Sequence, residues 1–263
     1  MILTLPVGHL INGDNYHQIP SVKALEYRDT TPILDNKLES IFHSGYGIVQ
    51  EEFLGYFESI VDYLNENNIK MFSFDIGPAV EKIKTVDYYY IARSEVLSKD
   101  EIRKIIRQRL KFIREKFHGD IALENLNYFP TSAYSHVCES NFISDIVRDN
   151  EVYMVLDIAH AIITVNNMEV DKYEYLASLP LNKVKEIHLS APGVKDGKWR
   201  DLHKEPGPQE YEVLRSILNN INVDPYLVIE CYKDFPTIEN CCKSLRNYFC
   251  KQNDKEEFDY CRI

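Results

Sequence analysis

The sequence has no apolar run near ~20 residues and no positively charged, apolar segment at its N-terminus. Membrane-spanning helices and secretion signals depend on such segments, so neither is expected. Positive charge is also scarce, because 30 lysine and arginine residues face 41 aspartate and glutamate residues, giving a formal net charge of −11. Non-specific binding to nucleic acid rests on clustered Lys and Arg. We therefore expect neither a membrane nor a nucleic acid as a partner.

Paired cysteines are missing as well. None of the six cysteines forms a C-x-x-C pair, and four of them lie in the last 23 residues. Without such pairs or a secretion signal, the pattern predicts free thiols in a reduced, cytoplasmic protein. We interpret the cysteines as small, partly buried hydrophobic residues: Cys138, Cys231, Cys241, Cys242, Cys250 and Cys261.

No glycine-rich fingerprint follows the first apolar run, which argues against a dinucleotide-binding open sheet, the main alternative fold. Instead, strand-like runs alternate with helical patterns and no long linker interrupts them, which predicts a parallel sheet of βα units. The expected strands are 2–7, 22–27, 69–74, 86–91, 121–124, 152–157, 184–189 and 226–231. The expected helices lie near 51–67, 98–118, 141–148, 171–178, 209–219 and 237–248.

The chain length also suits one closed barrel. It has 263 residues, of which 44% are hydrophobic, and a (β/α)8 barrel typically takes about 250 residues. We predict a single TIM-barrel domain over residues 1–250 and a polar C-terminal tail over 251–263. The stretches 28–50, with Pro32 and Gly45-Tyr-Gly47, and 190–207 are expected to be loops.

Four of the expected strands end on, or one residue after, a residue that can bind a metal ion: Glu124, Asp157, His188 and Glu230. In a (β/α)8 barrel the strand ends converge at one mouth, where active sites lie. The spacings of 33, 31 and 42 residues suit successive βα units. Carboxylate and imidazole are typical ligands of Mn, Fe or Zn. The pattern predicts a metal centre at this mouth.

Two short motifs, Asp157-x-x-His160 and Asp201-x-His203, add further candidate ligands. His160 follows Asp157 by about one helical turn and can face the same cavity. Taken singly, each candidate has a plain structural explanation, such as a solvated strand end or a core histidine. Taken together, the seven exceed what one ion needs, so two or three ions with bridging carboxylates are expected. Lys198 and Arg200 near the mouth could bind an anion or simply form a solvated loop.

Six segments resemble the multinuclear non-haem iron-dependent oxidative enzymes, the group that includes the methanobactin-biosynthesis barrel enzyme, within the xylose-isomerase-like TIM-barrel superfamily. They are Leu123-Glu-Asn-Leu-Asn-Tyr128, Cys138-Glu-Ser-Asn-Phe-Ile143, Val155-Leu-Asp-Ile-Ala-His160, the stretch from Tyr175 to Leu189, Arg200-Asp-Leu-His203 and Val228-Ile-Glu230. The resemblance covers roughly residues 121–248. The first half is similar only in outline, through Pro20-Ser-Val-Lys-Ala-Leu-Glu26.

The resemblance implies a barrel that holds two or three irons and uses molecular oxygen to oxidise a peptide or small thiol-bearing substrate, with a partner protein often presenting the peptide. The four strand-end residues would hold the central ions, and Asp201 with His203 a further one. Glu124 would bridge ions, and Glu124 and Glu230 are the catalytic candidates. Mn, Co or Zn are alternatives to iron.

This chain departs from the family pattern in its first half, where the histidines that the resemblance implies at the earlier strand ends are not found. The matching places are Phe74-Asp75-Ile-Gly77 and Asp87-Tyr-Tyr-Tyr90. One ion would therefore be missing, or held by Asp75 or a tyrosine such as Tyr88. Asn125 is a further candidate site residue.

Other functions fit the same residues. A single-metal sugar isomerase or epimerase would use Glu124 and Glu230 both as ligands and as proton-transfer groups. The Asp-x-x-His motif is also similar to zinc-dependent endonuclease IV, although the acidic charge disfavours a phosphodiesterase. A degenerate barrel that serves as a binding scaffold, without catalysis, is a fourth hypothesis.

Overall fold

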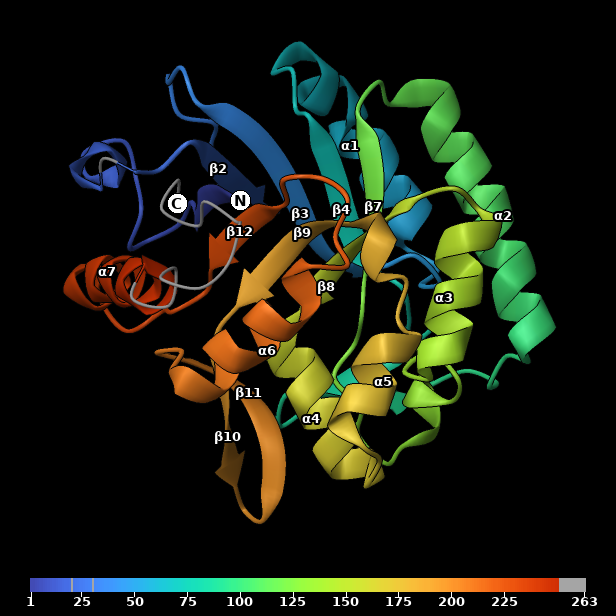
Figure 1. Cartoon of the computed structure of the whole chain (residues 1–263). Helices are drawn as coiled ribbons and strands as arrows, with labels where there is room; N and C mark the ends of the chain where they lie inside the picture. Colours follow the sequence, from blue (N-terminus) through green and yellow to red (C-terminus); the bar gives the residue numbers. More distant parts are fainter. Residues whose placement is uncertain (20, 30, 251–263) are drawn as a thin grey trace.

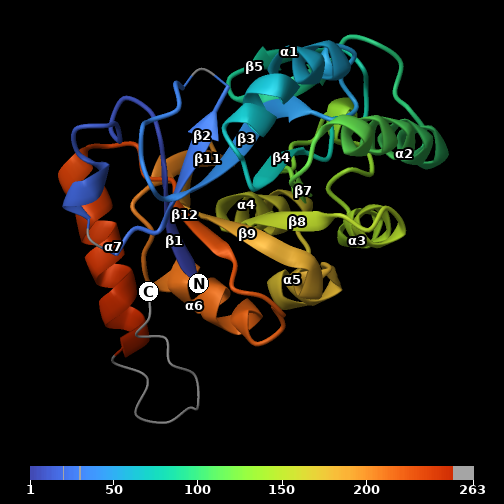
Figure 2. The same cartoon turned by 90° about the horizontal axis from the view of Figure 1, so that it is seen from above.

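Eight parallel strands form a closed barrel in the computed structural model, which describes residues 1–19, 21–29 and 31–250. These strands are β1 (Ile2–Pro6), β2 (Ala24–Arg28), β3 (Glu39–Gly47), β4 (Met71–Asp75), β7 (Asp120–Glu124), β8 (Tyr153–Asp157), β9 (Val184–Leu189) and β12 (Tyr226–Ile229). Around the barrel they follow the order β1-β12-β9-β8-β7-β4-β3-β2. The predicted α/β barrel is confirmed (Figures 1 and 2).

Helices surround the strands, as Figure 1 shows. They are α1 (Phe53–Glu66), α2 (Lys99–Lys116), α3 (Ser140–Asp149), α4 (Ile158–Met168), α5 (Lys172–Ser178), α6 (Pro208–Leu218) and α7 (Phe235–Cys250), with short 3-10 turns η1 (Tyr16–Gln18), η2 (Ser132–Tyr134) and η3 (Leu181–Lys183). The start of α2 shows why the sequence folds this way. The Ser98 hydroxyl accepts a hydrogen bond from the Glu101 backbone, and the Glu101 carboxylate accepts one from the Ser98 backbone. This reciprocal cap satisfies two backbone N–H groups at the helix start.

The sequence prediction was wrong about one barrel strand. The segment 28–50, expected to be a loop, contains β3. The run 86–91, expected to be a barrel strand, instead belongs to a hairpin of β5 (Ile83–Val86) and β6 (Tyr89–Ala92) outside the barrel. The chain reverses there because Asp87 and Tyr88 have φ angles of 47° and 72°, and positive φ at both central residues defines the tightest hairpin turn.

A second hairpin replaces the loop expected over 190–207. It pairs β10 (Ala191–Lys195) with β11 (Lys198–Lys204) and turns at Asp196-Gly197, where φ is again positive. In Figure 1 this hairpin extends away from the barrel at the foot of the view. It packs mainly against α4, the helix that follows β8 without a linker. Residues 191–204 therefore form a hairpin beside the barrel, not a loop.

The interior of the barrel is divided into an apolar layer and a polar layer. The apolar layer is formed by the buried side chains of Ala24, Ile41, Met71, Ala122, Val155, Tyr226 and Val228. Side chains two residues apart on a strand point to the same face. Two residues beyond six of these positions stand Glu26, His43, Ser73, Glu124, Asp157 and Glu230, all buried. The period of two along each strand therefore places the polar layer next to the apolar layer, toward the C-terminal ends of the strands.

The remaining sequence predictions concern the termini and the thiols. The tail 251–263 with Cys261, and Pro20 of the outline segment, lie outside the described residues. Four of the cysteines that the structure describes, Cys138, Cys231, Cys241 and Cys242, are free and buried. Within the described ranges, no helix combines the length and the apolar character needed to cross a bilayer.

Candidate metal centre

Glu124 lies at the middle of the polar layer and faces three imidazoles. Its Oε2 lies 3.2 Å from Nε2 of His43, and its Oε1 lies 3.0 Å from Nδ1 of His188. Nδ1 of His160 lies 3.6 Å from the same Oε1. The three histidines come from β3, β9 and α4, so the barrel closure brings distant segments onto one carboxylate.

His43 overturns the expectation that the first-half strands carry no histidine at the centre. It lies on β3, is buried, and its Nδ1 is 3.0 Å from the Ser73 hydroxyl. The sequence signal was short, because only Ile41 and Phe42 form the apolar stretch before this ligand-type residue.

Asp157 explains the three-residue spacing of its motif. One carboxylate oxygen, Oδ1, accepts a hydrogen bond of 2.6 Å from the backbone N–H of His160 and caps α4. The other oxygen, Oδ2, lies 3.9 Å from Nε2 of His160 and 3.9 Å from Nδ1 of His188. One oxygen therefore starts the helix, while the other faces the centre.

The β10–β11 hairpin brings Asp201 and His203 to the strand ends. Nε2 of His203 lies 3.2 Å from Oδ2 of Asp201 and 3.7 Å from Oε2 of Glu230. Oδ2 of Asp201 also lies 3.7 Å from Nε2 of His160. The His203 ring lies against Tyr232, with 4.7 Å between ring centroids. All seven residues predicted as metal ligands are thus gathered at one mouth of the barrel.

Overlapping ligand groups connect these side chains. In each group, one nitrogen or oxygen atom per residue lies within 4.8 Å of the others. The groups are His43–Asp75–Glu124, Glu124–Asp157–His160, Asp157–His188–Glu230 and a deeper Glu26–Glu186–His188. Glu124 and Asp157 each belong to two groups. Mixed carboxylate and imidazole donors suit Mn, Fe or Zn, so the residues present fit a metal centre.

The additional candidates fall into two sets: Asp75 and Asn125 lie at the strand ends, whereas Tyr88, Lys198 and Arg200 do not. Asp75 is buried beside Glu124 and belongs to a ligand group. Asn125 braces the ends of β7 and β8 instead: its amide accepts from the Asp157 N–H at 2.9 Å and donates to the Asp157 carbonyl at 3.1 Å.

Tyr88, Lys198 and Arg200 are not brought to the strand ends. Tyr88 is 69% exposed at a hairpin turn. Arg200 donates to the Asp87 carbonyl at 3.1 Å, and Lys198 lies over the Tyr89 ring at 5.8 Å. These contacts join the two hairpins to each other.

Sequence reasoning missed three further polar residues inside the barrel. Oε2 of Glu26 lies 2.9 Å and Oε1 of Glu186 lies 3.1 Å from Nε2 of His188. Nε of Arg28 lies 2.5 Å from Oε1 of Glu26, and the guanidinium also pairs with Glu230. Glu186 could have been found, because it stands two residues before His188 and so shares its face. Glu26 ends the run Val22-Lys-Ala-Leu-Glu26.

The acidic and imidazole groups shift one another's pKa values. Burial raises the pKa of the Asp157 carboxyl to about 8, and burial with the charge of Glu124 raises that of Asp75 well above its usual value. Burial opposes the charge of Glu124, but His43 and His188 outweigh it and hold its pKa well below its usual range. Burial opposes the charge of His188 too, yet neighbouring carboxylates raise its pKa. The metal-free centre therefore holds protons that a metal ion must displace.

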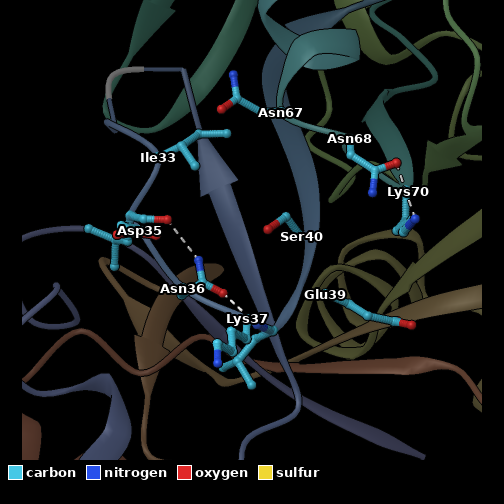
Figure 3. Close-up of a pocket in the computed structure, with 11 residues that line it drawn as sticks. Ile33, Asp35, Asn36, Lys37, Glu39, Ser40, Asn67, Asn68 and Lys70 are labelled. Atoms are coloured by element: carbon cyan, nitrogen blue, oxygen red, sulfur yellow. Dashed lines mark hydrogen bonds between the residues drawn. The ribbon is translucent and has the colours of Figure 1, made fainter.

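A cavity of about 560 Å³ opens beside this centre. Arg28 and Tyr232, which both contact Glu230, form part of its wall. The rest is largely apolar, with Val7, Leu10, Ile11, Pro32, Leu34 and Ile238. A second depression, of about 600 Å³, lies at the opposite end of the barrel among Asn36, Glu39, Asn67 and Lys70 (Figure 3). Glu39 begins β3 and Lys70 precedes β4, so this depression is remote from the strand ends.

Comparisons with known proteins agree with this geometry. The family model described as RiPP precursor modification enzyme MbnB/TglH/ChrH matches residues 95–248. A UPF0276 protein of Caulobacter vibrioides is 26% identical over 109 residues, 41% of this chain and 39% of the relative. This chain thus matches about two fifths of that relative's length.

Solved structures show the same fold at low identity. The 3-keto-D-glucoside 4-epimerase of E. coli superposes with a TM-score of 0.64 at 14% identity, covering 94% of this chain and 99% of that one. Endonuclease IV of Thermus thermophilus gives a TM-score of 0.63 at 11% identity, covering 95% and 100%. The xylose-isomerase-like barrel expected from the sequence is confirmed.

Proposed function

Because the chain belongs to the RiPP precursor modification enzyme family MbnB/TglH/ChrH, we propose that it is a di- or tri-iron enzyme that oxidises a peptide or small thiol-bearing substrate with molecular oxygen. The observation that carries this proposal is the sharing of Glu124 and Asp157 between neighbouring ligand groups. One ion needs no shared carboxylate, whereas bridging carboxylates are the usual way to hold ions close together.

The ligand groups give the first two ions their residues in this proposal. His43, Asp75 and Glu124 would hold one ion. A second would use Asp157, His188 and Glu230, with Glu124 beside them. A third would be held outside these groups by His160, Asp201 and His203, where Asp201 lies 3.7 Å from His160 and 3.2 Å from His203. Asp75 thus takes the place that the family resemblance assigns to a histidine.

Charge balance also supports more than one cation. Seven carboxyl groups lie in the centre or in the deeper group around Nε2 of His188: Glu26, Asp75, Glu124, Asp157, Glu186, Asp201 and Glu230. Arg28 is the one arginine among the described residues that contacts these carboxyl groups inside the barrel. Buried carboxylates without cations are costly and would otherwise take up protons.

Several side chains serve by holding others in place. Asn125 fixes the end of β8, and the Tyr232 hydroxyl donates to Glu230 at 3.3 Å. Irons bound here would supply the capacity to activate oxygen and accept electrons from the substrate. The apolar cavity beside Glu230 would admit the substrate and limit the access of water. A partner protein that presents a peptide, and a cytoplasmic location, belong to the same proposal.

A single-metal sugar isomerase or epimerase is the second candidate. Glu124, Asp157, His188 and Glu230 would suffice for it, and the epimerase of similar fold makes the comparison natural. In that reaction Glu124 and Glu230 would move protons at a carbon next to a carbonyl. A zinc-dependent phosphodiesterase is less favoured because the net charge of −11 would repel a phosphate backbone.

The test is metal analysis of protein purified without oxygen. We expect two or more irons per chain and an ultraviolet-visible spectrum that changes when oxygen is admitted. One Mn, Co or Zn per chain with no response to oxygen would overturn the oxidative proposal and favour the epimerase. No tightly bound metal at all would contradict both.

Stabilisation by metal is expected to grow with pH. The pKa of Asp157 is about 8 in the folded, metal-free protein and about 4 when unfolded, so the folded protein holds this proton more tightly. The metal-free protein therefore loses stability as pH rises between these values, while metal binding, which needs the ionised carboxylate, strengthens. The rise in melting temperature on adding Mn²⁺ should be larger near about pH 8.5 than near about pH 6. A rise that is equal or smaller at the higher pH would contradict this.

A further inference from the structure

The two ring nitrogens of His188 face different surroundings. Nδ1 points toward the candidate metal ligands, at 3.0 Å from Glu124, 3.6 Å from Glu230 and 3.9 Å from Asp157. Nε2 points the other way, deeper into the barrel, at 2.9 Å from Glu26 and 3.1 Å from Glu186. A metal ligand needs a free lone pair on one nitrogen, and the hydrogen then sits on the other.

We propose that Glu26 and Glu186 are positioning residues that keep the hydrogen of His188 on Nε2 and so present the lone pair of Nδ1 to the metal. The Glu26 carboxylate, which is paired with Arg28, can only accept hydrogen bonds, so its oxygen at Nε2 favours the ring form that donates there. The Glu186 oxygen beside it offers a second acceptor. Metal-binding histidines commonly donate their second N–H to a carboxylate, which fixes ring orientation and strengthens the ligand. The inference rests on the metal centre proposed above.

Both carboxylates are enclosed by the barrel, and Glu26 is also held by an ion pair. Glu26 and Glu186 are fully buried and stand on β2 and β9, which are not neighbours in the barrel. Their side chains therefore meet across the interior. The other oxygen of Glu26 lies 2.5 Å from Nε of Arg28, which itself pairs with Glu230. Arg28 thus ties the positioning carboxylate to a candidate metal ligand.

A cation between Glu26 and Glu186 is the competing explanation. It would use the second oxygen of Glu186, which is buried without a hydrogen-bond partner. Against it stands Arg28, which already supplies positive charge to Glu26 and would repel a metal ion placed beside it. The two explanations differ in one atom: the hydrogen on Nε2 is present in the first, and a metal ion replaces it in the second.

The decisive experiment is proton NMR of the Co²⁺-loaded full chain, in H₂O and in D₂O. Cobalt shifts the signals of its ligands far from the rest, and an N–H on a cobalt-bound ring disappears in D₂O. We expect such an exchangeable signal for His188, assigned by its loss in His188→Gln. It should persist in Glu26→Gln and Glu186→Gln, whose amide oxygens still accept. It should broaden or vanish in the double variant Glu26→Leu/Glu186→Leu.

Cobalt titration gives a second readout that does not depend on turnover. The double leucine variant should bind the ion at His188 about 10- to 100-fold more weakly, each single leucine variant less so, and the glutamine variants within about 3-fold of wild type. Leucine and glutamine are similar in size, so the contrast isolates the acceptor. If the double variant does not fold, the single variants and the wild-type spectrum still decide.

Each other outcome overturns the inference. An absent Nε2–H signal in wild type, or the loss of one cobalt per chain in the glutamine variants, would show that a cation lies between Glu26 and Glu186. Unchanged cobalt affinity in a folded double variant would leave Glu26 and Glu186 with a structural role only. Wild-type protein that binds neither Co²⁺ nor iron would overturn the metal centre itself, which separates that failure from the failure of this inference alone.

Discussion

A Glu124→Gln variant is expected to lose at least one tightly bound metal ion per chain and nearly all activity. Glu124 belongs to two ligand groups and lies within 3.2 Å of both His43 and His188. Glutamine keeps the size but removes the charge and one of the two metal-binding oxygens. Because loss of a residue that merely supports a ligand costs about 10- to 100-fold in metal affinity, loss of a bridging ligand should cost roughly 100-fold or more. Elemental analysis and metal titration would measure this.

Asp120→Asn is the matched control. Asp120 begins the same strand, β7, and pairs with Lys185 at the opposite end of the barrel. The variant removes one carboxylate charge from the same element but far from the centre. It should retain the full metal content. Equal metal content in the Glu124 and Asp120 variants would refute the bridging role of Glu124.

A Gly47→Ala variant is expected to be severely destabilised or to fail to fold. A Cβ atom at Gly47 would lie 1.6 Å from the Gly77 carbonyl oxygen and 2.6 Å from its carbonyl carbon. Both are backbone atoms of the segment after β4, so no side chain can move aside. Relief requires separating the ends of β3 and β4, which carry His43 and Asp75. We expect a loss of about 4 kcal/mol or more in the free energy of unfolding.

Gly55→Ala provides the control for this prediction. Gly55 lies in α1, and a Cβ there would meet no atom within 4 Å. Alanine is favoured over glycine in a helix by about 0.5–1 kcal/mol, so this variant should be slightly more stable than wild type. Urea unfolding of the metal-free proteins measures both changes. A Gly47→Ala protein that is as stable as Gly55→Ala would show that the close approach of the two backbones is wrong.

The part of the site that sequence could predict is the part built on long apolar runs. Glu124, Asp157, His188 and Glu230 each follow three or more residues with strand character, so their position at strand ends could be predicted from the sequence. The closed barrel adds what no local pattern contains. Glu26 meets His188 across the interior, 162 residues apart in the chain, and only the complete barrel brings them together.

The errors have physical causes. β3 follows a stretch with Pro32 and contains Gly45 and Gly47, which are poor strand formers taken alone. Its pairing with β2 and β4 overrides that weak local preference. In the β5–β6 hairpin, Asp87 and Tyr88 occupy a turn usually made by Asn-Gly or Asp-Gly, so the reversal had no sequence signal. Asp196-Gly197 did carry that signal.

The placement of Asp201 and His203 on the β10–β11 hairpin has a consequence for evolution. Most of the other candidate ligands stand at strand ends, which are tied to the stability of the whole barrel. The hairpin stands outside it and packs mainly on one helix. Insertions, deletions or exchanges there can add or remove the outermost ligands while the hydrogen-bonded barrel stays intact. In the proposed metal centre, the number of bound ions could therefore change without any change in the barrel.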